Sequence, residues 1–281
     1  MLSEGVHSVV DTANEILLLH GMRRAARPAD KQHPLGHGRE LYFWSFIVAL
    51  LVFALGAGVS IYGGIRRIRH PQPIENPAAS YIVLLLAFIF EGVTWYIALR
   101  QFNQARGELG IYQAFRRSKN PPAFTVLFED TAALIGIIAA AAGTFLAVHY
   151  NMPVYDGVAS IIIGLVLAAT SVLLARESKS LLIGESAHYH LDDDIMRITS
   201  EQKSLRGNGV MTFQLAPDQI VVALSVEFDD QMNTSQIEQA VSLLEQKIRA
   251  AHPEVMRLFV KPQTAEAFEA LLRAREEALE E

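Results

Sequence analysis

The sequence predicts an α-helical membrane domain followed by a small soluble α+β domain. Of the 281 residues, 51% are hydrophobic, which exceeds the share usual in soluble domains. These residues are concentrated in the first two-thirds of the chain, whereas the last third has the periodicities of a soluble fold. We therefore predict a membrane domain over residues 1–185, a cytoplasmic α+β domain over 186–263 and a charged C-terminal helix over 264–281.

Four apolar windows are long enough to cross a bilayer, for which a helix needs about 20 residues. They are residues 43–65, 81–99, 124–148 and 154–175. The first of them carries a glycine series that we expect to permit close helix packing: Gly56, Gly58, Gly63 and Gly64. A fifth window, 2–22, is also long enough but contains Glu4, His7, Asp11, Asn14 and Glu15. Because such side chains are costly in lipid, this fifth span must face other helices or water.

Basic residues indicate the orientation, because Lys and Arg are enriched in cytoplasmic loops. Five of them lie between windows 2–22 and 43–65, and Arg106, Arg116, Arg117 and Lys119 lie in the loop after window 81–99. Both loops are therefore predicted to be cytoplasmic, together with the C-terminal domain. The basic residues Arg66, Arg67 and Arg69 lie on the predicted outer side and argue mildly against this orientation.

The soluble third predicts a two-layer α+β domain. Residues 220–228 alternate between apolar and smaller or polar side chains, which is typical of a half-buried strand. The expected order is a helix at 194–203, strands at 210–215 and 219–228, a second helix after 235 and a strand at 255–261. This order suits helices packed on one sheet face. Ser235 and Glu238 are expected to form a capping box at the start of the second helix.

Composition excludes several classes of function. The chain has no cysteine, so a metal site must use His, Asp, Glu or backbone oxygen. Its net charge is −6 and basic residues form no cluster, which argues against nucleic-acid binding. The tail has no nucleophile–base pair and no phosphate loop, so we predict that the protein is not an enzyme.

Two helices carry residues suited to binding a metal ion. His7 and Asp11 are four residues apart and therefore share one helical face. Asp130 lies within another predicted span, where an ionisable residue indicates function. The alternative is that all three only form polar contacts between helices. We favour a metal site, because these ligand types suit a tetrahedral zinc ion.

These residues lie in strings that resemble the cation diffusion facilitator family of zinc transporters. The strings are His7-Ser-Val-Val-Asp11, His33-Pro-Leu-Gly-His37-Gly-Arg, the span with Asp130, and Asp156-Gly-Val-Ala-Ser. The resemblance covers nearly the whole chain. It implies a six-helix family fold, of which the second to sixth helices are recognised and the first is missing, followed by a ferredoxin-like cytoplasmic domain. It also implies a homodimer that exports metal from the cytoplasm in exchange for protons.

The resemblance also implies a shared transport site and an accessory site in a cytoplasmic loop. The transport positions are His7, Asp11, Asp130 and Val126, and the accessory positions are Asp30, His33 and His37. Val126 cannot bind metal, so Glu129, Glu91 and water remain candidates for the fourth ligand. Glu129 points about 100° away from Asp130 on a helix and would need a local distortion. The alternative for the loop is a tight Pro-Gly turn with surface histidines.

Proton-coupled transport follows from such ligands, because a metal ion competes with protons for imidazole and carboxylate groups. We expect an antiporter that works by alternating access and favours zinc, although manganese, iron(II) or cobalt would also suit an oxygen-rich site. A non-transporting membrane scaffold or metal sensor acting through a dimeric tail is the alternative. The lack of a presequence favours a bacterial-type inner membrane.

Overall fold

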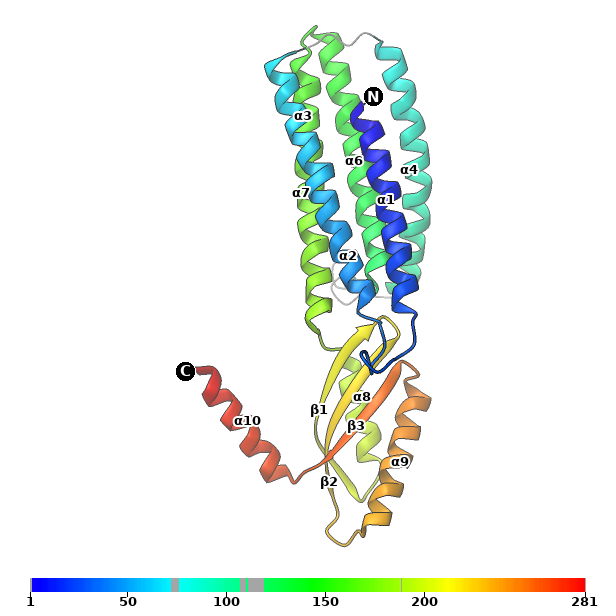
Figure 1. Cartoon of the computed structure of the whole chain (residues 1–281), viewed down its shortest axis with the longest axis vertical. Helices are drawn as coiled ribbons and strands as arrows, with labels where there is room; N and C mark the ends of the chain where they lie inside the picture. The colour runs from blue at the N-terminus through cyan, green and yellow to red at the C-terminus, as the bar shows by residue number, and fades with distance from the viewer. Residues whose placement is uncertain (1, 72–75, 107–109, 111–118, 188, 281) are drawn as a thin grey trace. The chain divides into compact units, whose positions relative to one another are not determined.

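The computed structural model describes residues 2–71, 76–106, 110, 119–187 and 189–280 (Figure 1). The chain divides into two compact units, Met1–Leu182 and Ile183–Glu281. The first unit is a helical bundle and the second contains a three-stranded sheet. Each unit is described below by itself.

The described part of the first unit consists mainly of helices. The helices are α1 (Leu2–Ala25), α2 (Glu40–Leu51), η1 (Val52–Ala57), α3 (Gly58–Arg69), α4 (Pro77–Arg106), α6 (Pro121–His149) and α7 (Val154–Ile183). The segment η1 is a π-helical stretch that joins α2 to α3 without a break. Proline opens both α4 and α6, where its fixed φ and missing N–H are tolerated.

Four helical stretches are long and apolar enough to cross a membrane. Within the described residues they are Glu40–Arg69, Pro77–Gln104, Phe124–His149 and Val154–Ile183. Each contains one of the four apolar windows predicted from the sequence. The 24-residue helix α1 is not among them, because its polar residues lower its hydropathy. Length and composition therefore support four of the five predicted spans.

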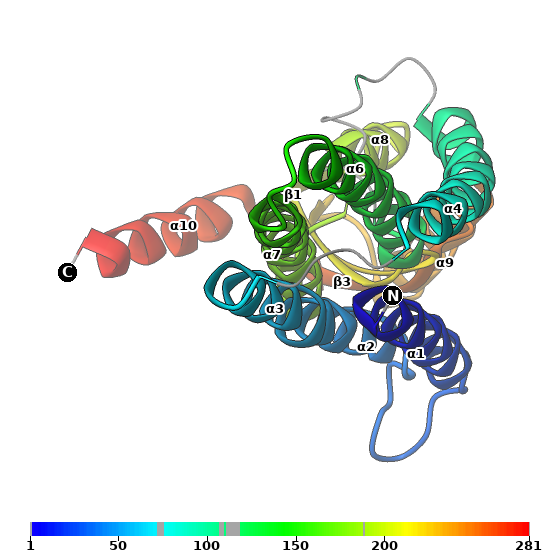
Figure 2. The same ribbon diagram turned by 90° about the horizontal axis from the view of Figure 1, so that it is seen from above.

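Helices α3 and α7 pack closely through glycines, and Figure 2 shows them side by side. A Cβ atom on Gly64 would lie 2.7 Å from the carbonyl oxygen of Gly157, and one on Gly157 would lie 2.9 Å from that of Gly64. A Cβ atom on Gly63, by contrast, would meet nothing within 4 Å. The predicted role of the whole glycine series was therefore wrong at Gly63, because adjacent helical residues point about 100° apart.

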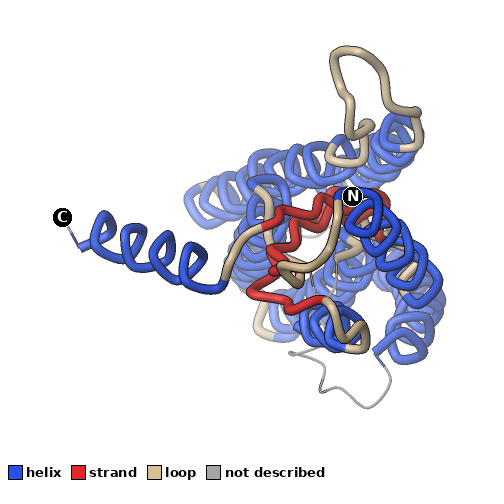
Figure 3. Tube along the Cα trace, turned by 90° about the horizontal axis from the view of Figure 1, so that it is seen from below, coloured by secondary structure: helices blue, strands red, loops and turns tan. Residues whose placement is uncertain are grey.

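The second unit begins with α8 (Tyr189–Ser200), followed by the strands β1 (Leu205–Ala216) and β2 (Gln219–Phe228). The remaining elements are α9 (Thr234–Ala251), β3 (Val255–Pro262) and α10 (Ala265–Glu280). The sheet has the order β1-β2-β3, with β1 antiparallel and β3 parallel to the central β2 (Figure 1). Figure 3 shows the strands in red. This is the element order that the sequence predicted for the tail.

The core of the second unit lies between the sheet and the helices α8 and α9. Alternate residues of β2, namely Ile220, Val222, Leu224 and Val226, are buried in one apolar cluster. The same cluster contains Ile195 of α8 and both Leu244 and Ile248 of α9. Both helices therefore cover one face of the sheet, as the period-two pattern indicated. Near the start of α10, Phe268 lies against Gly209 of β1, and the helix beyond it is exposed.

Three predicted positions in this unit were wrong, and one of them is the start of β1, which lies at Leu205 and not at 210. Helix α8 begins at Tyr189, five residues before the predicted start, because Leu191 is buried and extends the apolar face of the helix. The capping box of α9 uses Asn233 and Gln236, two residues before the predicted Ser235 and Glu238. Both pairs have suitable side chains, and the extended backbone at Asn233 determines which pair caps the helix.

Candidate metal sites

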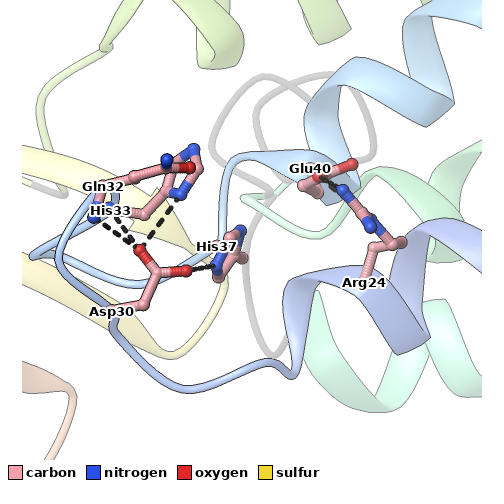
Figure 4. A network of polar contacts seen from close by, with 6 residues as sticks. All are labelled: Arg24, Asp30, Gln32, His33, His37 and Glu40. Carbon is pink, nitrogen blue, oxygen red and sulfur yellow. Dashed lines mark hydrogen bonds and ion pairs between the residues drawn. The ribbon is translucent and has the colours of Figure 1, made fainter.

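The loop between α1 and α2 brings Asp30, His33 and His37 together (Figure 4). Their possible ligand atoms all lie within 4.8 Å of one another. His37 Nε2 is 3.1 Å from Asp30 Oδ2, and His33 Nδ1 is 3.4 Å from Asp30 Oδ1. Two imidazoles and one carboxylate in this arrangement can bind one divalent ion, with water in a fourth position.

The backbone of the loop determines this geometry. Asp30 Oδ1 accepts hydrogen bonds from the N–H groups of Gln32, at 2.8 Å, and His33, at 2.7 Å. The N–H of Gly36 then donates to the carbonyl oxygen of His33 at 2.9 Å. Gly36 has φ of 81°, a conformation that favours glycine. The turn reverses the direction of the chain, and His37 therefore lies next to the Asp30 carboxylate.

Hydrogen bonding also determines the charge of the carboxylate. The backbone N–H of His33, and then the ring of His37, lower the pKa of Asp30 to about 2. Such bonds favour the ionised form, because they stabilise its negative charge. Asp30 is therefore ionised at neutral pH and can bind a cation without releasing a proton.

An ion pair holds the ends of this loop together. Arg24, near the end of α1, places Nη2 2.6 Å from Oε1 of Glu40, the first residue of α2. The other oxygen of Glu40 accepts a hydrogen bond from Trp44 Nε1 at 3.0 Å. His37, three residues before Glu40, is only 9% exposed. The loop thus has anchored ends and one buried histidine, whereas Asp30 and His33 remain exposed.

The predicted transport residues lie on α1 and α6. His7 and Asp11 occupy positions four residues apart in helix α1, but their side chains lie outside the described part of the structure. Asp130 is half-buried in α6, and its Oδ2 is shielded from solvent. The geometry that joins Asp130 to the α1 pair therefore stays a prediction.

The candidates for the fourth ligand have different surroundings. Val126 packs against an apolar cluster that contains Phe124 and Leu127, so this position of α6 faces a dry environment. Glu129 accepts a hydrogen bond from Asn14 Nδ2 of α1 at 3.4 Å. This contact joins α1 to α6 one residue before Asp130. The sequence identified Asn14 only as a polar residue unsuited to lipid, and its position three residues after Asp11 was the available signal.

Glu91, the remaining candidate, is partly buried on α4. One turn further along α4, Trp95 Nε1 donates to Thr131 Oγ1 of α6 at 3.0 Å. Because Thr131 follows Asp130 directly, this contact brings α4 close to the Asp130 turn. No described contact joins Glu91 to Asp130, so its role as a ligand stays a prediction.

A cavity of about 260 Å³ lies among α3, α4, α6 and α7. Its lining on α6 begins at Ala132 and Ala133, within one turn of Asp130. Its polar lining includes Arg67, whose Nη1 is 3.0 Å from Asp156 Oδ2 and donates to Ser160 Oγ at 2.9 Å. The cavity therefore extends from the neighbourhood of Asp130 to an ion pair between α3 and α7.

The fold and these residues define a membrane protein of the cation transporter class. Residues 1–183 match the cation efflux transmembrane domain. This match covers well over half of the chain, and the chain therefore belongs to the cation efflux family, also called the cation diffusion facilitators.

Several characterised or named relatives are similar over most of this chain. The proton-coupled zinc antiporter SLC30A9, mitochondrial, of Xenopus laevis is 37% identical over 202 residues, which is 71% of this chain and 35% of the relative. Its Mus musculus counterpart is 32% identical over 238 residues, 83% of this chain and 42% of the relative. Metal tolerance protein C4 of Arabidopsis thaliana is 30% identical over 213 residues, 75% of this chain and 45% of the relative. The chain thus spans less than half the length of these relatives.

Proposed function

We propose that the protein is a divalent cation/proton antiporter that favours zinc and exports it from the cytoplasm by alternating access. The observation that carries the proposal is an acidic residue, Asp130, within the apolar stretch Phe124–His149 of a cation efflux domain. An ionisable side chain within a membrane-spanning helix is energetically costly, so its presence there indicates a function. The relatives named as proton-coupled zinc antiporters support both the ion and the exchange.

Competition between metal and protons supplies the coupling. His7, Asp11 and Asp130 would bind the cation as a neutral imidazole and ionised carboxylates. Protons must leave these groups when the cation enters and return to them when it leaves. The cavity beside Asp130 offers a route for the cation toward the end of the bundle that contains Arg67 and Asp156.

The loop site would act as a second, accessory metal site. Asp30, His33 and His37 lie in a loop that the basic residues predict to be cytoplasmic. A cation captured there would be held at the side from which it is exported. A turn with two surface histidines remains the alternative, and direct metal binding to this loop distinguishes the two.

The proposal includes a particular architecture. Helix α1 would be a fifth span that faces other helices, and the second unit would be a ferredoxin-like cytoplasmic domain through which two copies form a homodimer. The family consists of transporters rather than enzymes, which agrees with the tail lacking catalytic motifs. The relatives give no support for the preferred bacterial-type inner membrane, because the antiporters among them are named as mitochondrial.

A second candidate is a membrane scaffold or metal sensor that does not transport. The observation in its favour is Val126, an apolar residue at the fourth transport position. An antiporter for manganese, iron(II) or cobalt is a closer variant, because an oxygen-rich site also suits these ions.

Metal flux into liposomes tests the proposal. The purified chain is reconstituted with a zinc-sensitive dye inside the vesicles, and a pH gradient is imposed in each direction. We expect gradient-driven zinc uptake in the native chain, its loss in Asp130→Asn and its retention in Asp218→Asn, which changes an exposed carboxylate in the soluble unit. If the native chain carries neither zinc, manganese nor cobalt, the scaffold becomes the better explanation.

A further inference from the structure

Asn14 on helix α1 is a buried polar residue, and no hydrogen bond among the described residues involves its amide oxygen. Only 1% of the residue is exposed. Its Oδ1 atom is shielded from solvent and has no hydrogen-bond partner among the residues that the structure describes. A buried amide oxygen without a donor is unfavourable, so native proteins rarely keep one unless a ligand or an ion uses it.

The neighbouring glutamate determines which amide atom lacks a partner. Asn14 Nδ2 lies 3.4 Å from Glu129 Oε1 on α6. A carboxylate oxygen accepts hydrogen bonds, so the NH₂ group and not the carbonyl oxygen must face Glu129. The orientation of the amide is therefore fixed by chemistry, and the oxygen is directed elsewhere in the interior of the bundle.

The position of Asn14 on α1 relates it to the proposed transport site. It follows Asp11 by three residues and His7 by seven, and residues with this spacing lie on the same helical face. Its contact on α6 is Glu129, the residue directly before Asp130. Asn14 thus shares a helical face with the proposed ligands of α1 and contacts the residue beside the proposed ligand of α6, whereas Val126 packs in an apolar cluster.

We propose that Asn14 is an additional ligand of the transport site, and that its Oδ1 binds the cation in place of the ligand missing at Val126. This inference rests on the proposed function. An amide carbonyl is a neutral oxygen ligand, so Asn14 would add to the coordination of the cation without adding a group that must release a proton. It would also make the site richer in oxygen, which favours Mn²⁺ and Co²⁺ relative to a site with a second histidine.

Metal binding to the full chain in detergent tests the proposal. The loop site is first removed by the double substitution His33→Ala and His37→Ala, so that binding reports the transport site. Zn²⁺ affinity is then measured by titration calorimetry in two buffers of different ionisation enthalpy, which also gives the number of protons released. The Co²⁺ absorption spectrum reports the coordination of the bound ion.

Three substitutions separate a ligand from a packing residue. Asn14→Leu keeps the branched shape of the side chain but has no oxygen. Asn14→Asp keeps the oxygen but cannot donate to Glu129. Ser45→Ala is the matched control, because Ser45 is equally buried, at 1% exposed, and its hydroxyl donates to the Leu41 carbonyl of its own helix.

If Asn14 is a ligand, Asn14→Leu should weaken Zn²⁺ binding by roughly 10–100-fold and alter the Co²⁺ spectrum, and it should leave the number of released protons unchanged. Asn14→Asp should bind at least as tightly as the native chain, whereas Ser45→Ala should bind normally. If Asn14→Leu fails to fold, Asn14→Asp still tests the proposal. A residue that is needed only as a hydrogen-bond donor to Glu129 would lose this role in Asn14→Asp as well.

Two results would overturn the proposal in different ways. If Asp130→Asn abolishes binding but Asn14→Leu keeps native affinity and the native Co²⁺ spectrum, Asn14 is a packing residue and the proposed function stands. If neither Asp130→Asn nor Asn14→Leu changes binding, the site between α1 and α6 is itself wrong and the proposed function fails with it.

Discussion

We expect the same substitution, glycine to alanine, to have opposite effects at two adjacent positions of α3, Gly63 and Gly64. In Gly64→Ala the new Cβ would lie 2.7 Å from the carbonyl oxygen of Gly157 and 3.0 Å from the backbone nitrogen of Ile161. Backbone atoms of α7 cannot rotate away, so α3 and α7 must separate. In Gly63→Ala the new Cβ would meet nothing within 4 Å. Gly63→Ala is therefore a matched control one residue away.

The expected difference follows from two opposing effects. Replacing glycine by alanine within a helix is favourable by about 1 kcal/mol, and this gain is shared by both variants. Overpacking a close contact costs about 1–3 kcal/mol and applies only to Gly64→Ala. The two variants should therefore differ by about 1–3 kcal/mol, with Gly63→Ala as stable as the native chain or more so. For a unit of this size that corresponds to roughly 2–12 °C in Tm.

Tryptophan fluorescence during heating measures this difference. The chain has two tryptophans, Trp44 and Trp95, and both lie in the first unit. Their emission therefore reports the unfolding of the membrane unit without a signal from the second unit. Equal Tm values for Gly63→Ala and Gly64→Ala would refute the close contact between α3 and α7.

Three further predictions concern the loop site and the second unit. Asp30→Asn should weaken Co²⁺ binding to the loop by roughly 10–100-fold. The factor should be the same at every pH from about 5 to 8, because the lowered pKa keeps Asp30 ionised throughout this range. A factor that changes with pH would contradict this prediction. Burial raises the pKa of Asp192, although its hydrogen bond from Thr212 opposes the effect. Above the raised pKa the ionised carboxylate destabilises the folded unit, so Asp192→Asn should stabilise the sheet at pH 7. In hydrogen-exchange measurements this gain should decrease as the pH falls through the raised pKa and be lost below about 4, the ordinary pKa of Asp. Asn233→Ala should destabilise α9 by about 1 kcal/mol in the same measurement, whereas Ser235→Ala should have little effect, and the opposite order would restore the predicted cap.

Four of the five predicted spans and the order of elements in the second unit could be predicted from the sequence because both depend on local patterns. Hydropathy over about 20 residues is sufficient to identify a spanning helix. Alternation along residues 220–228 identified a strand, and its apolar set is the one buried beneath α8 and α9. The grouping of the candidate ligands Asp30, His33 and His37 could also be predicted, because they lie within eight residues of one another in sequence.

Boundaries were less predictable where two local solutions compete. Asn233 with Gln236 and Ser235 with Glu238 are both possible capping boxes. Sequence offers no measure of the backbone conformation at either position, and the extended φ and ψ of Asn233 determine the outcome. The start of α8 depends similarly on the burial of Leu191 in a core that is completed by distant strands.

The sequence by itself determined that this chain has apolar spans, a small α+β unit and a loop with closely spaced histidine and aspartate side chains that could bind a metal ion. Only the tertiary structure showed that Gly64 and not Gly63 contacts α7, that Arg67 pairs with Asp156, and that Asn14 meets Glu129. Each of these contacts joins residues on different helices. Periodicity tells which residues share one face of a helix, but it does not tell which face of another helix lies opposite, because that depends on how the whole bundle packs.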